Sequence, residues 1–212
     1  MSTVVDLKLM GKPTTKPRKH RTGRRPGPSS TRDDILRAAR RLFAESGYER
    51  ATFRSIAADA GVDPALVVQF FGSKKQLFAA ATVSPVTLAE LSEQSEPGPP
   101  AEAGLRLARL LMRWLDDEGA RQALLGRIRS ASSEPEAADA VREMIDGQLT
   151  AFAAQMDADR PDVRASLLAT QFLGVVLARF VVRSEPLASM EPAEIAEWLA
   201  PTFDLYLNGP SA

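Results

Sequence analysis

Three side chains between residues 52 and 78 have the chemistry needed to hold or read nucleic acid. Arg54 carries a forked guanidinium that can donate two hydrogen bonds to a guanine edge, and Leu66 can meet a thymine methyl group. Lys74 stands at the expected start of a helix, where backbone N–H groups already favour a phosphate. These contacts are useful only if rigid elements hold the three side chains in place.

The surrounding segment, TFRSIAADAGVDPALVVQFFGSKKQLF, predicts a short helix, a tight turn and a second short helix. Thr52 can cap the first helix through its hydroxyl, and Gly61 can adopt the left-handed backbone that side chains resist. Asp63 can cap the second helix, with Pro64 at its first position. This is the layout of a DNA-reading helix-turn-helix.

The apolar pattern of the second helix separates an inner side from an outer side. Val67 and Phe71 lie four residues apart and are expected to be buried. The residues left facing outward are Leu66, Val68, Gln69 and Phe70. Alternatively, the three apolar members of this outward set pack internally and say nothing about DNA sequence preference.

Residues 31–81 resemble the DNA-binding domain of the TetR family of bacterial transcriptional regulators. The pattern F-x-x-x-G-Y/F falls on residues 43–48, T-x-x-x-I-A-x-x-A-G-V on residues 52–62, and F-x-S-K on residues 71–74. Residues 171–207 also resemble the C-terminal ligand and dimer domain of one TetR subgroup. So many correctly spaced matches make the resemblance specific.

The resemblance implies a base contact from Arg54. It implies phosphate or sugar contacts from Thr52, Gln69, Phe70 and Lys74. Ala65 and Leu66 complete the candidate DNA-binding set. Val68 departs from the family pattern, which most often has a tyrosine at this position, so one hydrogen bond to phosphate is expected to be lost.

The charges are divided sharply along the chain although they sum to zero. Residues 1–78 carry 16 Lys and Arg against 7 Asp and Glu, and the remaining residues carry 11 against 20. A basic front half attracts phosphate backbones and an acidic back half is repelled by them. The division favours one-sided docking on nucleic acid over an ordinary solvated charge distribution.

Residues 1–30 are expected to form a disordered basic arm, since they offer almost nothing apolar to bury. The arm's cations near the first helix are Lys16, Arg18, Lys19, Arg21, Arg24 and Arg25. Such an arm can follow phosphates or insert arginines into a minor groove, with Arg24 and Arg25 as the candidate contacts. The alternative is a solubilising tail.

No strand-type alternation is present, so the predicted fold is all-α. A three-helix helix-turn-helix domain over residues 31–78 is expected to join a helical bundle over residues 79–212 that binds an effector and dimerises. The expected helices outside the helix-turn-helix cover residues 31–46, 101–117, 120–132, 136–156, 161–183 and 192–207.

The stretch ASLLATQFLGVVLARFVV is apolar on nearly all sides, and Gly174 and Ala178 permit close helix approach at a subunit interface. The expected partner surface on the last helix consists of Ile195, Trp198, Leu199, Phe203 and Leu207. A core helix inside a monomer is the alternative. Residues 167–182 are short for a membrane span and contain Gln171 and Arg179, so a buried helix is predicted and no membrane partner.

The effector pocket is expected among apolar side chains between the C-terminal helices. The candidate ligand-binding residues are Met112, Trp114, Met144, Phe152 and Phe172, near Leu111 and Leu115. Each of them is also ordinary core material. They favour a mostly apolar effector, and the resemblance implies that its binding releases the DNA operator.

The sequence contains no cysteine, and its only histidine, His20, lies in the arm. No catalytic residues, metal site or cofactor are therefore predicted, and the absence of cysteine fits a cytoplasmic protein. The helix-turn-helix and the apolar C-terminal helix predict specific DNA binding as a homodimer, and the resemblance implies that the protein is a repressor of a palindromic operator. The alternative is an architectural DNA-binding protein that senses no ligand.

Overall fold

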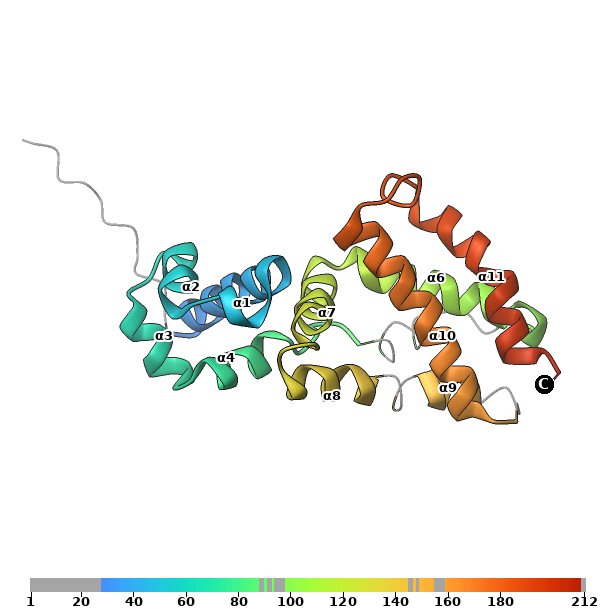
Figure 1. The fold of residues 1–212 in the computed structure, drawn as a ribbon, viewed down its shortest axis with the longest axis horizontal. Helices are drawn as coiled ribbons and strands as arrows, with labels where there is room; N and C mark the ends of the chain where they lie inside the picture. Colours follow the sequence, from blue (N-terminus) through green and yellow to red (C-terminus); the bar gives the residue numbers. More distant parts are fainter. Residues whose placement is uncertain are drawn as a thin grey trace, which may run out of the picture.

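The structure is a computed structural model that describes residues 28–87, 90, 93, 98–144, 147, 149–154 and 159–210 (Figure 1). Within these ranges all regular secondary structure is helical, as predicted. The arm cations, including Arg24 and Arg25, lie outside the described residues.

Helices α1 (Pro28–Arg50), α2 (Phe53–Ala60), α3 (Pro64–Phe71) and α4 (Lys74–Ala81) form the head at one end of the molecule (Figure 1). Helix α1 begins three residues before the predicted start. Its helical geometry is interrupted at Gly47, where φ is 77°, next to the predicted end at residue 46. A positive φ is readily adopted only by glycine, so the break falls where the sequence permits it.

The described residues after α4 form the body, whose regular elements are also helical. Its elements are η1 (Pro100–Glu102), α6 (Ala103–Asp116), α7 (Glu118–Ser130), α8 (Pro135–Met144), α9 (Thr150–Ala154), α10 (Pro161–Val176), η3 (Leu177–Val182) and α11 (Pro192–Asn208). The helix predicted for residues 136–156 is helical wherever the structure describes it, since Gly147 and Leu149 between α8 and α9 have π-helical backbone.

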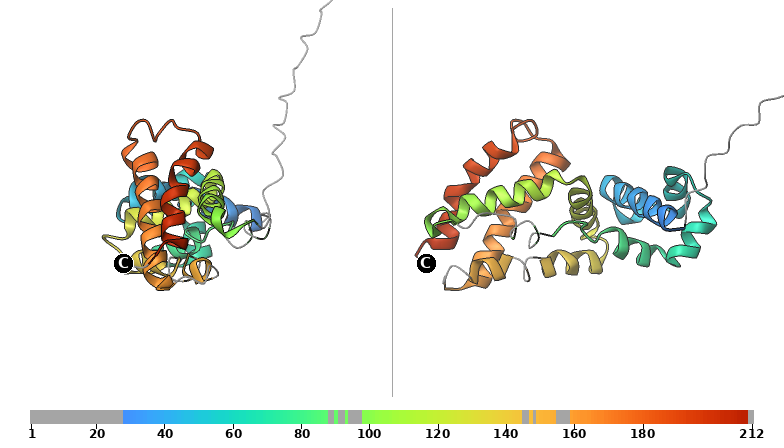
Figure 2. Two further views of the ribbon diagram at one scale, coloured as in Figure 1. Left: turned by 90° about the vertical axis from the view of Figure 1, so that its right-hand side faces the viewer. Right: turned by 180° about the vertical axis from the view of Figure 1, so that it is seen from behind.

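Helix α7 lies between the head and the far helices α6, α10 and α11 (Figures 1 and 2). The head has its own apolar core, whose larger members are Ile35, Phe43, Ile56, Val67, Phe71, Leu77 and Phe78. Ala137 of α8 is fully buried in this same core. The body therefore contributes directly to the head's core.

The second core joins α6, α10 and α11. Gly104 of α6 lets α11 approach its backbone, since a Cβ atom there would lie 2.5 Å from the Asp204 nitrogen and 2.6 Å from the Ala200 oxygen. The Gly104 amide donates a 2.7 Å hydrogen bond to Asp204 Oδ1. No larger residue fits at this crossing without moving backbone.

Most of the partner surface predicted on the last helix belongs instead to the chain's own core. The four buried residues are Ile195, Leu199, Phe203 and Leu207. Their spacing of four places them all on one side of α11, the side that contacts α6. The prediction is wrong for these four residues. Trp198 and Leu205 are 74% and 59% exposed.

The apolar helix predicted to be buried is covered on one side only. By length and composition alone, Pro161–Val182 could cross a membrane, with a mean hydropathy of 1.8, and 33% of this window is buried. Its inner side carries Leu168 and Phe172, both nearly inaccessible, whereas Val163 and Leu167 are 38% and 40% exposed. The single chain leaves the outer side of α10 uncovered, so the prediction is wrong for that side.

A buried arginine fastens the start of α10 to the end of α11. Arg164 donates hydrogen bonds to the Asp159 oxygen at 2.7 Å, to Asp159 Oδ1 at 2.5 Å, to the Tyr206 oxygen at 2.6 Å and to the Gly209 oxygen at 2.9 Å. The carbonyl groups at the C-terminal end of a helix lack partners within that helix. Arg164 supplies such partners at the end of α11.

Candidate DNA-binding site

The first helix of the helix-turn-helix is capped as predicted. Thr52 Oγ1 accepts a 3.1 Å hydrogen bond from the Ser55 amide, and Ser55 Oγ accepts a 3.0 Å bond from the Thr52 amide. This reciprocal arrangement satisfies two amides at the start of α2. Gly61 ends the helix with φ at 68°, the left-handed conformation expected of it.

The second helix begins at its predicted cap, and the helix after it is capped in a similar way. Asp63 Oδ1 accepts a 2.8 Å hydrogen bond from the Ala65 amide, and Ser73 caps α4 together with Gln76. Val67 and Phe71 are buried in the head core, as their spacing predicted. The local sequence therefore determines where α3 begins and which of its sides is buried.

The outward side of α3 is partly apolar and partly available. Ala65 and Gln69 are exposed, Val68 is 47% exposed and Leu66 is half-buried. Phe70 packs against the head core. The alternative prediction, that the outward apolar residues pack internally, is therefore confirmed for Phe70.

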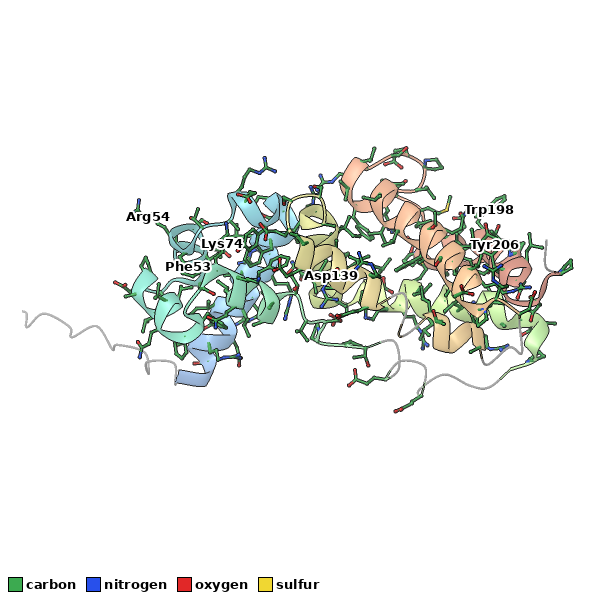
Figure 3. The ribbon with its side chains drawn as sticks, turned by 60° about the horizontal axis from the view of Figure 1, so that its bottom comes forward. Phe53, Arg54, Lys74, Asp139, Trp198 and Tyr206 are labelled. Carbon is green, nitrogen blue, oxygen red and sulfur yellow. The ribbon has the colours of Figure 1, made fainter. Side chains whose placement is uncertain are left out.

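Arg54 is the side chain best placed to meet a base. It is exposed on α2 and has no hydrogen bond or ion pair within the described part of the chain. Figure 3 shows it projecting at the opposite end of the molecule from Trp198. An exposed guanidinium without a partner can pair with DNA without first breaking a contact.

Two other candidate DNA contacts, Thr52 and Lys74, already form contacts within the protein. The Thr52 hydroxyl caps α2, as described above. Lys74 Nζ donates a 3.1 Å hydrogen bond to the Glu49 oxygen and lies 4.4 Å from the centre of the Tyr48 ring. A phosphate would have to share or replace these contacts of the ammonium group.

The contacts between head and body were not predicted from the sequence. A Cβ atom on Gly126 of α7 would lie 3.4 Å from Phe43 Cβ, so α1 and α7 pack closely. The Tyr48 amide donates a 3.0 Å hydrogen bond to Ser130 Oγ. On the other side of the head, Lys75 of α4 pairs with Glu136 of α8, and this hydrogen bond lowers the pKa of the Glu136 carboxyl.

The candidate ligand-binding residues occupy different places. Trp114 borders a cavity of about 220 Å³, and Met112 borders another of about 120 Å³. Phe172 is buried in the second core, with its ring centre 6.4 Å from that of Trp114. The side chains of Met144 and Phe152 lie outside the described part of the structure. A ligand role for these five residues stays a prediction.

The candidate dimer residues lie on the two C-terminal helices. Gly174 is exposed with open space beside it, Ala178 is half-buried and Trp198 is largely exposed. A surface cavity of about 330 Å³ also opens between α10 and α11, beside Leu167 and Leu205.

Comparison with protein families gives two matches. Residues 35–81 match the domain described as bacterial regulatory proteins, tetR family. Residues 101–207 match the domain described as tetracyclin repressor-like, C-terminal. The second match alone covers half of the chain.

Individual relatives agree with these matches. A TetR-family regulator from Streptomyces coelicolor has a similar structure, with a TM-score of 0.56 and 31% identity over 87% of this chain and 98% of that one. SmeT, solved in complex with triclosan, has a TM-score of 0.59 and 22% identity over 83% of this chain and 90% of its own, which shows a shared fold. The transcriptional repressor AcnR of Corynebacterium glutamicum is 43% identical over 53 residues, 25% of this chain and 28% of AcnR.

Proposed function

Because the chain belongs to the TetR family of bacterial regulatory proteins, we propose that it represses transcription by binding a palindromic operator as a homodimer. The observation that carries this proposal is the helix-turn-helix with an exposed, unpartnered Arg54 at the end of the head. The family consists of regulators and not of enzymes. The protein would act in the cytoplasm.

In the proposed complex α3 enters the major groove and Arg54 contacts a base. Gln69 is exposed on the same outward side of α3 as Ala65 and supports a phosphate or sugar contact. Thr52 and Lys74 would add contacts to the backbone of the DNA from the starts of α2 and α4. Leu66 is left to meet an apolar base edge.

We propose that the outer sides of α10 and α11 form the dimer interface. The exposed apolar residues that support it are Val163, Leu167, Leu177, Trp198 and Leu205. Exposed apolar side chains are unfavourable in water, and burying them in an interface stabilises the dimer by about 25 cal/mol per Å². A symmetric dimer would present two heads to half-sites about 34 Å apart.

The decisive experiment selects genomic fragments with the purified protein and maps the protected bases. A repressor of this kind protects one palindrome with two half-sites, and its mass in solution is that of a dimer. Protection spread evenly over unrelated fragments would instead support an architectural DNA-binding protein. A monomer that retains full operator affinity would contradict the dimer.

The double variant Leu167→Glu, Trp198→Glu should separate the dimer and lower operator affinity by more than about 100-fold, because linked heads gain that much from binding together. Sedimentation and fluorescence anisotropy measure both effects. The matched control is Val83→Glu, which charges an exposed apolar residue away from α10 and α11 and should leave the dimer intact. An unchanged mass of the double variant would exclude this interface.

Deleting residues 1–25 should weaken binding to operator and random DNA alike. Each lost phosphate contact lowers the slope of log affinity against log salt by about 0.9. The control keeps the length and charges of the arm but shuffles their order, and it should bind like the full chain. If the slope is unchanged after deletion, the arm makes no phosphate contacts.

We further propose that a small molecule bound in the C-terminal domain releases the protein from DNA. SmeT, which shares the fold, was solved with triclosan, and this supports a ligand-binding role for the corresponding domain here. The apolar surroundings of Trp114 favour a largely apolar compound. Such a ligand must bind the DNA-free conformation more tightly than the DNA-bound one. A ligand with equal affinity for the two conformations would not change the fraction of protein on DNA.

A further inference from the structure

The 220 Å³ cavity lies where the segment that follows α4 meets α6, α7 and α8. Val86 comes from that segment, Trp114 from α6, Arg127 from α7 and Glu143 from α8. Trp114 and Val86 give the cavity an apolar wall. Arg127 gives it a strong hydrogen-bond donor.

Most other donors at the cavity already have acceptors. The Ser84 hydroxyl donates to the Val86 oxygen, and Trp114 Nε1 donates to that same oxygen at 2.8 Å. The Thr87 amide and hydroxyl donate to Glu90 Oε2 at 2.8 and 2.9 Å. A ligand would gain little from any of these groups.

Arg127 is the exception. Its Nε is buried without a hydrogen-bond partner, and no carboxylate of the described residues forms an ion pair with its guanidinium. Burial lowers the pKa of Arg127, an effect that the charge of Glu143 opposes, but an arginine in a protein stays protonated. Arg127 is half-buried as a whole, but its Nε is buried with an unused donor, which is unfavourable unless an acceptor pairs with it.

We propose that this cavity is the effector site and that Arg127 binds an anionic group of the effector, which is therefore an amphipathic acid. The acid's apolar part would lie against Trp114 and Val86, while its carboxylate or similar group pairs with the guanidinium. The proposal rests on the proposed effector-controlled function and adds a charged group to the apolar ligand.

The position of the cavity explains how a bound ligand could affect the head. The cavity is bordered by residues 84–87, directly after α4, and by α8, which carries Glu136 and Ala137. Those two residues contact Lys75 and the head core. A ligand that moves either border changes how the head sits on the body.

Isothermal titration of the full chain with matched acids and amides tests the proposal. The probes are octanoate against octanamide and 2-naphthoate against 2-naphthamide, which differ in charge and hardly in shape. At least one acid should bind at least about tenfold more tightly than its amide. Arg127→Gln should remove this preference, and Arg127→Lys should keep part of it, since lysine retains the charge without the fork.

A second variant keeps the test valid if Arg127→Gln does not fold. Glu143→Gln removes the negative charge beside the guanidinium, so it should tighten binding of the acid severalfold and leave the amide unchanged. Equal binding of acid and amide would overturn the proposal. Absence of saturable binding by either acid up to its solubility limit would also overturn it.

The same titrations repeated with operator DNA separate this proposal from the proposed function. Acid binding that depends on Arg127 supports the anionic site, whether or not the acid releases DNA. If the acid binds and the operator complex persists, the acid does not control DNA binding, but the anionic binding site is supported. If the chain binds no DNA, repression fails and the titrations still decide the site.

Discussion

Arg54→Ala lowers the operator affinity of the dimer by about 2–6 kcal/mol, because each of two heads loses a base contact worth about 1–3 kcal/mol. The side chain is exposed and forms no hydrogen bond or ion pair with the described residues, so folding should be unaffected. Fluorescence anisotropy on the operator measures the loss. Operators changed one base pair at a time should show that the preference relaxes at a single position per half-site.

The matched control is Arg142→Ala, which removes an exposed arginine of α8 whose one ion pair among the described residues is with Asp139 of its own helix. Its operator affinity should stay close to that of the unchanged protein. Equal weakening of Arg54→Ala on every DNA sequence would make Arg54 a phosphate contact and not a base contact.

Arg164→Met should lower the free energy of unfolding by about 3–6 kcal/mol, because the Tyr206 and Gly209 carbonyls each lose a hydrogen bond to a charged donor worth about 1.5–3 kcal/mol. The Arg164 side chain is only 10% exposed and donates four hydrogen bonds, two of them to carbonyls near the end of α11. Chemical denaturation at one fixed protein concentration measures the loss, since dimerisation alters apparent stability.

Arg160→Ala is the corresponding control. Arg160 is 70% exposed and lies 3.8 Å from Asp162, so its loss should cost at most about 1 kcal/mol. If Arg164→Met is equally mild, the end of α11 is held by other contacts and the four hydrogen bonds contribute little net free energy.

The head could be predicted because its signals are local. Caps at Thr52, Asp63 and Ser73 depend on residues two or three positions away, and the Gly61 turn depends on one backbone conformation. The inner stripe of α3 follows from helical spacing. None of these features requires knowledge of a distant segment.

The body could be predicted less well, because segments distant in the sequence decide which side of each helix is buried. The stripe that contains Ile195 and Phe203 could face a partner chain or α6, and only the fold shows that α6 covers it. Arg127 and Arg164 look like ordinary helix arginines in the sequence. Segments far away along the chain bury Arg164 and the Nε of Arg127.

The candidate DNA contacts show the same division. Helical spacing correctly predicted an exposed Gln69, and the resemblance selected Arg54. The sequence could not show that Lys74 is engaged by Tyr48 and Glu49, because that contact depends on how α1 ends beyond Gly47.

The two attachments of the head to the body respond differently to ionic strength. The α1–α7 contact combines close packing of Gly126 on Phe43 with a hydrogen bond between uncharged groups of Tyr48 and Ser130, so salt hardly weakens it. The α8 contact buries Ala137 in the head core and adds the Lys75–Glu136 pair, whose side chains are 67% and 51% exposed, and dissolved ions screen only this charged part. Raising the salt concentration should therefore loosen the orientation of the head before it disturbs the fold. Part of the salt sensitivity of operator binding would then originate inside the protein, away from the DNA surface.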